Sequence, residues 1–206
     1  MNIDTKKIAL ELIDTFKIAG DVSIKLRKDG LIKEIKKDNT PVTNGDIEVN
    51  KILTEKISKV TPDIPIVSEE TVDLHTKNIN KTFWLIDPID GTKDYIKKRD
   101  EYTINAALII DYKPAIGIIY APAKDRLFFS YGKNLAFEIN NGKKKVLSCK
   151  KINTNEIIGL ENSDTTPGDI LKIYNKYKVS RTLKMSSSLK FCIIASGEAD
   201  IYAARA

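Results

Sequence analysis

Asp87 and Asp90 lie three positions apart in the sequence D-P-I-D-G, directly after the apolar run 83–86. The run predicts a short buried strand and D-P-x-D-G predicts a turn that leaves it, so both carboxylates should project from one tight bend. Two carboxylates a few ångströms apart repel each other by roughly 4 kcal/mol at an effective dielectric of about 20. A cation would offset this repulsion, and oxygen ligands without His or Cys favour Mg²⁺ over Zn²⁺. The alternative is a plain Asp-rich turn.

The residues after this pair could hold a phosphate group. Gly91 lets the main chain approach a ligand closely, and the amides of Gly91 and Thr92 would be free to bind a phosphate oxygen if Thr92 opens a helix. Thr92 could equally serve only as a helix cap.

Further acidic residues follow other predicted elements. Glu69 comes at the end of the apolar run 65–68, where it could be a ligand or a solvated acid. Asp46 follows Thr43 by three positions at the start of an amphipathic helix, which is also the spacing of a capping box. The chain therefore offers acids from three separate stretches to one site.

The hydrophobic patterns place these segments on a coarse framework. Apolar spacing predicts a first helix ending by Gly30 and a second ending near Pro62, packed against a largely antiparallel sheet. From about residue 153 the pattern changes to a strand over 157–160, a helix over 168–176, a second helix over 188–197 and a last strand at 201, typical of an α/β half. We therefore predict an N-terminal α+β domain over 1–150 and a partial α/β domain over 151–206. His75, in the polar stretch 73–81, is interpreted as an exposed loop residue.

Four motifs resemble the inositol monophosphatase superfamily. They are P-V-T-x-x-D from Pro41, I-V-S-E-E from Ile66, W-L-I-D-P-I-D-G-T-K-D from Trp84 and S-S-L-K-F-C from Ser187. The block 83–107 is most similar to its CysQ-type 3'(2'),5'-bisphosphate nucleotidases. The resemblance implies a layered α-β-α-β-α sugar-phosphatase fold and a Mg²⁺-dependent phosphatase that removes the 3'-phosphate from 3'-phosphoadenosine 5'-phosphate, in sulfur assimilation and nucleotide recycling.

The same resemblance assigns roles to individual residues. Two or three Mg²⁺ ions would be bound by Glu69, Asp87, Asp90 and the main-chain carbonyl of Ile89, with Asp87 bridging two of them. Thr92, held by Asp46, would act with Glu69 to orient and deprotonate the attacking water. The substrate-binding residues implied are Glu69, Ile89, Asp90, Gly91, Thr92, Ser187, Ser188 and Lys190, the last meeting a second phosphate. From the residues alone, the serines before Leu189 are also a good helix N-cap.

The chain departs from the resembling enzymes at its end. Those enzymes continue past the strand at 199–202 into a Trp-Asp-x-Ala segment, whose Asp supplies a further metal ligand. This sequence stops at Ala206. We therefore expect an incomplete C-terminal α/β part and impaired activity, whether the truncation is natural, a frameshift or deliberate. Two alternatives remain open: an inositol monophosphatase-type sugar phosphatase, and an inactive remnant that only binds metal or a partner.

Composition limits the other function classes. The net charge is +6, but the lysines are spread along the chain without interleaved aromatic residues, so nucleic-acid binding is not predicted. No stretch approaches the roughly 18 to 20 apolar residues of a transmembrane segment. Cys149 and Cys192 form no C-x-x-C motif, which favours a reducing, cytoplasmic location. The resemblance leaves open a homodimer and peripheral attachment to the cytoplasmic face of the inner membrane.

Overall fold

The computed structural model describes residues 3–36, 40–71, 80–149, 155–162 and 166–205. Its helices are α1 (Thr5–Asp29), α2 (Asn44–Val60), α3 (Thr92–Ile96), α4 (Gly168–Lys176) and α5 (Leu189–Ala195), with a 3₁₀ turn at Pro122–Lys124. Its strands are β1 (Lys33–Ile35), β2 (Pro41–Thr43), β3 (Ile66–Ser68), β4 (Phe83–Asp90), β5 (Thr103–Ile110), β6 (Lys113–Ala121), β7 (Arg126–Ser130), β8 (Ala136–Asn140), β9 (Lys143–Val146), β10 (Ile157–Glu161), β11 (Val179–Lys184) and β12 (Ile201–Tyr202).

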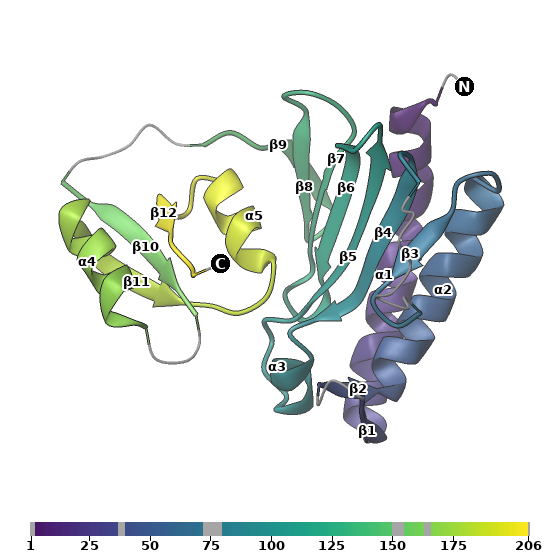
Figure 1. The fold of residues 1–206 in the computed structure, drawn as a ribbon, viewed down its shortest axis with the longest axis horizontal. Helices are drawn as coiled ribbons and strands as arrows, with labels where there is room; N and C mark the ends of the chain where they lie inside the picture. Colours follow the sequence, from purple (N-terminus) through teal and green to yellow (C-terminus); the bar gives the residue numbers. More distant parts are fainter. Residues whose placement is uncertain (1–2, 37–39, 72–79, 150–154, 163–165, 206) are drawn as a thin grey trace.

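The elements stack in alternating layers, which Figure 1 shows from right to left. Helices α1 and α2 cover one face of a sheet with the order β3-β4-β5-β6-β7-β8-β9. Helix α5 lies on the opposite face, between this sheet and a smaller one with the order β11-β10-β12, and α4 covers the outer face of the smaller sheet. The predicted α-β-α-β-α arrangement is confirmed.

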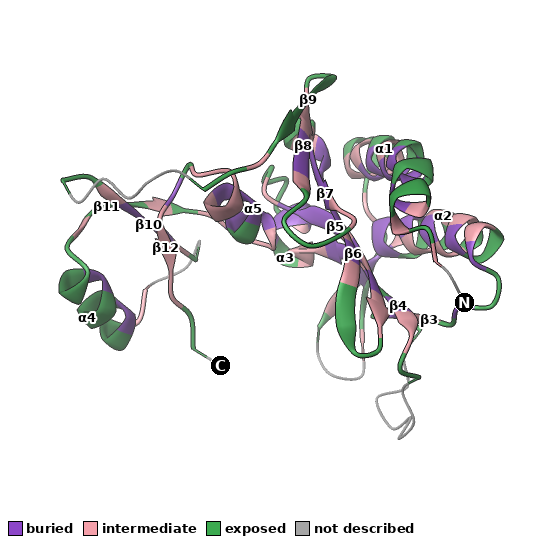
Figure 2. Cartoon of the chain, turned by 90° about the horizontal axis from the view of Figure 1, so that it is seen from above, coloured by how far each residue is buried: buried purple, intermediate pink, exposed green. Residues whose placement is uncertain are grey.

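Alternation along the strands explains the two-sided packing of the large sheet. In β7, Leu127 and Phe129 join the core formed with α1 and α2, whereas Phe128 between them joins the core formed with α5. Successive side chains of a strand point to opposite faces, so one strand contributes to both cores. Figure 2 shows the buried residues concentrated where the layers meet.

The two long helices end where the sequence predicts. α1 stops at Gly30, whose φ of 117° favours glycine, and α2 stops at Thr61, just before Pro62. At its start, α2 has the capping box that the Thr43 and Asp46 spacing suggested, with both reciprocal hydrogen bonds present. This cap fixes Asp46 in the first turn of the helix.

The predicted turn at Asp87 is wrong. Strand β4 continues to Asp90, and it pairs with β5 through Asp87 with Asn105 and Asp90 with Thr103. Three residue steps on β4 therefore oppose two steps on β5, so β4 carries one extra residue as a β-bulge. Pro88 explains the interruption in part, because it has no N–H to donate to the ladder.

Strands β2, β9 and β11 were not predicted from the sequence. β9 is fully exposed and lies at the edge of the large sheet, where lysines are typical, so it has no hydrophobic alternation to detect. β11 is also an edge strand with mostly exposed residues. The helix predicted over 188–197 is shorter in the structure, where it runs from Leu189 to Ala195.

The interpretation of His75 lies outside the described residues, as does the proposed domain boundary near residue 150. Within the ranges that the structure describes, no helix is both long and apolar enough to cross a membrane.

Candidate active site

The carboxyl end of β4 brings together acids from two adjacent strands. β3 runs parallel to β4, and the Glu69 amide, just past β3, donates to the Ile86 carbonyl at 3.0 Å. This hydrogen bond places Glu69 beside Asp87. The charges of Asp90 and Glu69 both act on Asp87, so the three predicted acids are electrostatic neighbours.

Asp87 is the least satisfied of these acids. Its Oδ1 is buried and has no hydrogen-bond partner. Burial, followed by repulsion from Asp90 and Glu69, raises the pKa of Asp87 to about 8, although the Asn105 amide acts in the opposite direction. Ionised Asp87 would be costly to the fold without a partner, so its ionisation calls for a cation at this position.

A second cluster joins α2 to the first turn of α3. The Asp46 Oδ2 accepts from the Thr43 amide at 2.8 Å and from the Thr43 hydroxyl at 2.6 Å. Its other oxygen lies 3.3 Å from the Thr92 hydroxyl, which is 3.0 Å from the Ile89 carbonyl oxygen. Asp46 therefore caps its helix and holds Thr92, so the two interpretations of this residue are compatible. Burial is the main cause that raises the pKa of Asp46.

The start of α5 closes the site from the other side. The Ser188 amide donates to Asp90 Oδ2 at 2.5 Å, and the Ser188 hydroxyl lies 2.8 Å from Asn105 Oδ1. Its side chain makes no helix-capping bond. The positive charge of Lys190 acts on Asp90, and burial lowers the pKa of Lys190 against the pull of the surrounding acids.

Gly91 lies between these groups in a left-handed conformation, with φ at 91°. A Cβ added there would stand 3.5 Å from the Cβ of Ser187, so Gly91 and Ser187 are neighbours. The sequence-predicted site residues thus lie in one region around the end of β4.

Two polar neighbours of these acids were not predicted from the sequence. Lys36, next to β1, places its ammonium 3.2 Å from Glu69 and 2.9 Å from Glu70. Asn105 belongs to β5 and faces both Asp87 and Ser188. Pairing of β4 with β5 brings Asn105 opposite Asp87, and only the register of the sheet could have revealed it.

The donor set suits a hard divalent cation. It comprises carboxylate oxygens and a main-chain carbonyl, which are the ligands of Mg²⁺, and the orphaned Asp87 oxygen lies among them. Across the described ranges, no group of three or more His, Cys, Asp or Glu side chains already forms a closed metal-ligand cluster. The acids are neighbours whose side chains would have to converge further around an ion.

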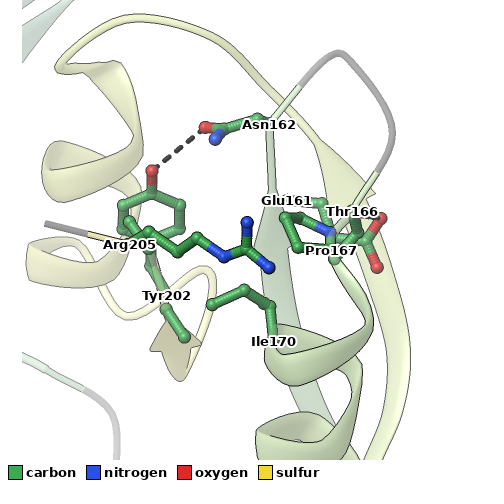
Figure 3. A pocket seen from close by; sticks show the side chains of 9 residues that line it. Glu161, Asn162, Thr166, Pro167, Ile170, Tyr202 and Arg205 are labelled. Atoms are coloured by element: carbon green, nitrogen blue, oxygen red, sulfur yellow. Dashed lines mark hydrogen bonds between the residues drawn. The ribbon is translucent and has the colours of Figure 1, made fainter.

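A cavity of about 270 Å³ lies at the carboxyl ends of β10 and β12. Figure 3 shows Asn162 hydrogen-bonded to the Tyr202 hydroxyl, at 3.0 Å, with Arg205 and Ile170 beside them. The Lys190 ammonium lies 5.1 Å from the centre of the Tyr202 ring. Since Lys190 also acts on Asp90, it connects this cavity with the acids.

Comparison with known proteins settles the family. The sequence pattern of the inositol monophosphatase family matches residues 4–206. The chain belongs to this family. Its similarity to the 3'(2'),5'-bisphosphate nucleotidase CysQ of Buchnera aphidicola is 40% identity over 169 residues, which cover 81% of this chain and 63% of that protein. The chain thus spans less than two thirds of the length of this relative.

Solved structures of family members share the fold. The crystal structure of CysQ from Bacteroides thetaiotaomicron has a TM-score of 0.77 at 25% identity, covering 98% of this chain and 80% of that one. An inositol monophosphatase/NADP phosphatase, whose structure was solved with Mg²⁺ and phosphate, has a TM-score of 0.79 at 20% identity, covering 97% and 75%. At this identity, the second comparison speaks for the fold alone.

Proposed function

We propose that this chain carries the machinery of a Mg²⁺-dependent phosphatase acting on 3'-phosphoadenosine 5'-phosphate. The observation that carries the proposal is the unpartnered Asp87 oxygen, buried next to two further acids. The Ile89 carbonyl of the same strand lies 3.0 Å from the Thr92 hydroxyl, which also contacts Asp46. Such a site favours cations and, through them, an anionic substrate. The name of the Buchnera relative supports the choice of a bisphosphate nucleotide.

Glu69, Asp87, Asp90 and the carbonyl of Ile89 are the residues that would hold the ions. When bound, Mg²⁺ supplies charge neutralisation for the phosphate oxygens and for the leaving group. Phosphomonoester hydrolysis depends mainly on positioning of the reacting groups and on neutralisation of the charge on the phosphoryl and leaving oxygens.

The chain's own residues orient the attacking water. The Thr92 hydroxyl can direct its proton to Asp46 or to the Ile89 carbonyl, so its lone pairs can accept a hydrogen bond from a water. The Glu69 carboxylate can accept a hydrogen bond from the other O–H of that water, which keeps this proton. Together they would align the water for in-line attack on phosphorus, and Asp46 would take up the proton passed through Thr92.

The opposite wall would hold the substrate. The Gly91 backbone approaches without a side chain, and the Ser187 and Ser188 loop faces it. Lys190 is the cation suited to a second phosphate, and the cavity at Tyr202 offers an aromatic ring and the Asn162 amide to a nucleoside. A bisphosphate nucleotide uses both features, whereas inositol phosphate uses neither.

Phosphate release tests the proposal directly. The purified chain is incubated with 3'-phosphoadenosine 5'-phosphate or inositol 1-phosphate, each with Mg²⁺ and with a chelator. We expect release from the nucleotide with Mg²⁺ alone and none after Asp87→Asn. Preference for inositol phosphate would assign the sugar phosphatase activity instead. No release from either compound, with Mg²⁺ still raising the Tm, would indicate a binding-only protein.

A further inference from the structure

An ion-pair network ties the sheet to the far end of α5. The Arg126 side chain, from β7, donates through Nε to Glu138 of β8 at 2.6 Å. Its two terminal nitrogens donate to the two oxygens of Glu198, at 3.1 and 2.5 Å. This is a bidentate Arg–carboxylate pair, which fixes orientation as well as distance.

The sheet side of this network is buried and paired on both oxygens of Glu138. The Glu138 side chain is fully buried, and Arg126 exposes only 14% of its side chain. Lys145, the direct cross-strand neighbour of Glu138 in β9, places its ammonium 2.8 Å from the second Glu138 oxygen. Burial would raise the pKa of Glu138, but Arg126 and Lys145 outweigh it and hold this pKa below its usual value. The pair with buried Glu138 therefore holds Arg126 in place independently of Glu198.

The other side of the network belongs to α5. Glu198 lies in the turn directly after the helix, and its amide donates to the Ile193 carbonyl at 3.0 Å. The Ser196 hydroxyl, at the C-cap, donates to Glu198 Oε1 at 2.7 Å. A force that moves Glu198 therefore moves the last turn of α5.

The first turn of the same helix reaches the candidate active site. Ser188, at its N-cap, donates to Asp90, and Lys190 acts on Asp90 by charge. With seven residues at a rise of about 1.5 Å each, α5 is about 10 Å long, so a tilt of about 10° at one end moves the other by about 2 Å. Displacements of this size matter for substrate alignment.

We propose that Arg126 is a positioning residue, which sets the position of α5 through Glu198 so that Ser188 and Lys190 meet Asp90 and the substrate. The inference rests on the proposed function for its kinetic consequence only. Arg126 touches neither the acids nor the substrate wall, and its effect is transmitted by a helix of two turns. The geometric consequence, order at the Ser188 amide, exists without any substrate.

Glu198→Ala is the informative variant, because Glu198 is half-exposed and its loss leaves Arg126 paired with buried Glu138. Glu156→Ala is the matched control, since it removes an exposed pair with Arg181 at 3.5 Å that does not involve α5. Glu198→Gln retains one side-chain oxygen for Arg126, so its exchange rate and its kcat/KM should lie between those of Glu198→Ala and the unmodified protein. The two measurements are hydrogen exchange at the Ser188 amide without ligand, and kcat/KM for 3'-phosphoadenosine 5'-phosphate with Mg²⁺.

In Glu198→Ala we expect exchange at Ser188 to be at least fivefold faster, exchange in α1 to be unchanged, and kcat/KM to fall about tenfold. Glu156→Ala should match the unmodified protein in both measurements. Unchanged exchange at Ser188 would overturn the proposal, and so would an equal acceleration throughout α1, which indicates general destabilisation. If the unmodified chain releases no phosphate, the proposed function fails, but the exchange measurement still decides the positioning role.

Discussion

Replacing Asp87 by Asn should stabilise the metal-free protein at alkaline pH while it removes Mg²⁺ binding and activity. The reason is the pKa of Asp87, which burial and the neighbouring acids raise to about 8, from an ordinary value of 3.8. Between these values the folded protein keeps a proton that the unfolded chain has released. The stability contribution is therefore fully present below about pH 4 and is lost as the pH rises toward 8.

The size of the stability loss follows from the difference between the two pKa values of Asp87. Each pKa unit corresponds to about 1.4 kcal/mol, so four units set an upper limit of about 6 kcal/mol for the loss between pH 4 and pH 8. Water entry and side-chain relaxation reduce such penalties in proteins, and we expect about 2 to 3 kcal/mol. The Asn amide never ionises, so at pH 8 the metal-free variant should be more stable than the unmodified protein by about 2 kcal/mol.

Urea unfolding at pH 5, 6, 7 and 8, with a chelator or with Mg²⁺, measures both consequences. With Mg²⁺ at a hundredfold excess over its Kd, the unmodified protein should regain about 2.7 kcal/mol, whereas the variant should gain almost nothing. Asp63→Asn, which changes an exposed carboxylate in the turn after α2, is the control. It should change neither the pH dependence of the unfolding free energy nor the stabilisation by Mg²⁺. A variant that is less stable at pH 8 without metal, or that keeps the full Mg²⁺ response, would refute the assigned role of Asp87.

Three further substitutions test the surroundings of the acids. Thr92→Val should lower kcat by about 10²- to 10³-fold because it removes the water-orienting hydroxyl, and Thr92→Ser should restore most of it; equal rates for Val and Ser would contradict this role. Gly45→Ala should reduce the free energy of unfolding by about 1 to 3 kcal/mol, since its Cβ would stand 2.6 Å from the Tyr95 hydroxyl oxygen, and an unchanged urea midpoint would count against that contact. Lys36→Met should lower the Tm of the metal-free protein, because it leaves the mostly buried Glu70 without its cation, and added Mg²⁺ should recover part of the loss; a raised Tm without metal would show that the pair is not stabilising.

The sequence predicted elements well wherever their signal is local. The amphipathic spacing and terminal signals of α1 and α2 depend on neighbouring residues only, and their ends agree with the structure. α4 has the predicted bounds, Gly168–Lys176, for the same reason. All side chains of the edge strand β9 are exposed, so its residues show no hydrophobic alternation from which a strand could be predicted.

The residues of the candidate site were easier to predict than their arrangement in space. The acids were found through their motifs, but their arrangement depends on strand register, which places Asn105 opposite Asp87. Lys36 was overlooked because a lysine in a polar stretch resembles any solvated charge. Its ammonium meets Glu69 and Glu70 through the tertiary structure, in which segments more than 30 residues apart come together.

The bulge in β4 explains why the error about the turn left the chemistry intact. Residues three positions apart in a regular strand point to opposite faces, so Asp87 and Asp90 would be separated by the sheet. The extra residue in the bulge brings Asp87 and Asp90 to the same side of the strand. This agrees with the repulsion from Asp90 that helps to raise the pKa of Asp87. Pro88 favours this arrangement, because a residue without an N–H cannot restore the regular ladder at that point. The D-P-x-D spacing is therefore better interpreted as a device that keeps two acids on one side of a strand, where cations can offset their repulsion.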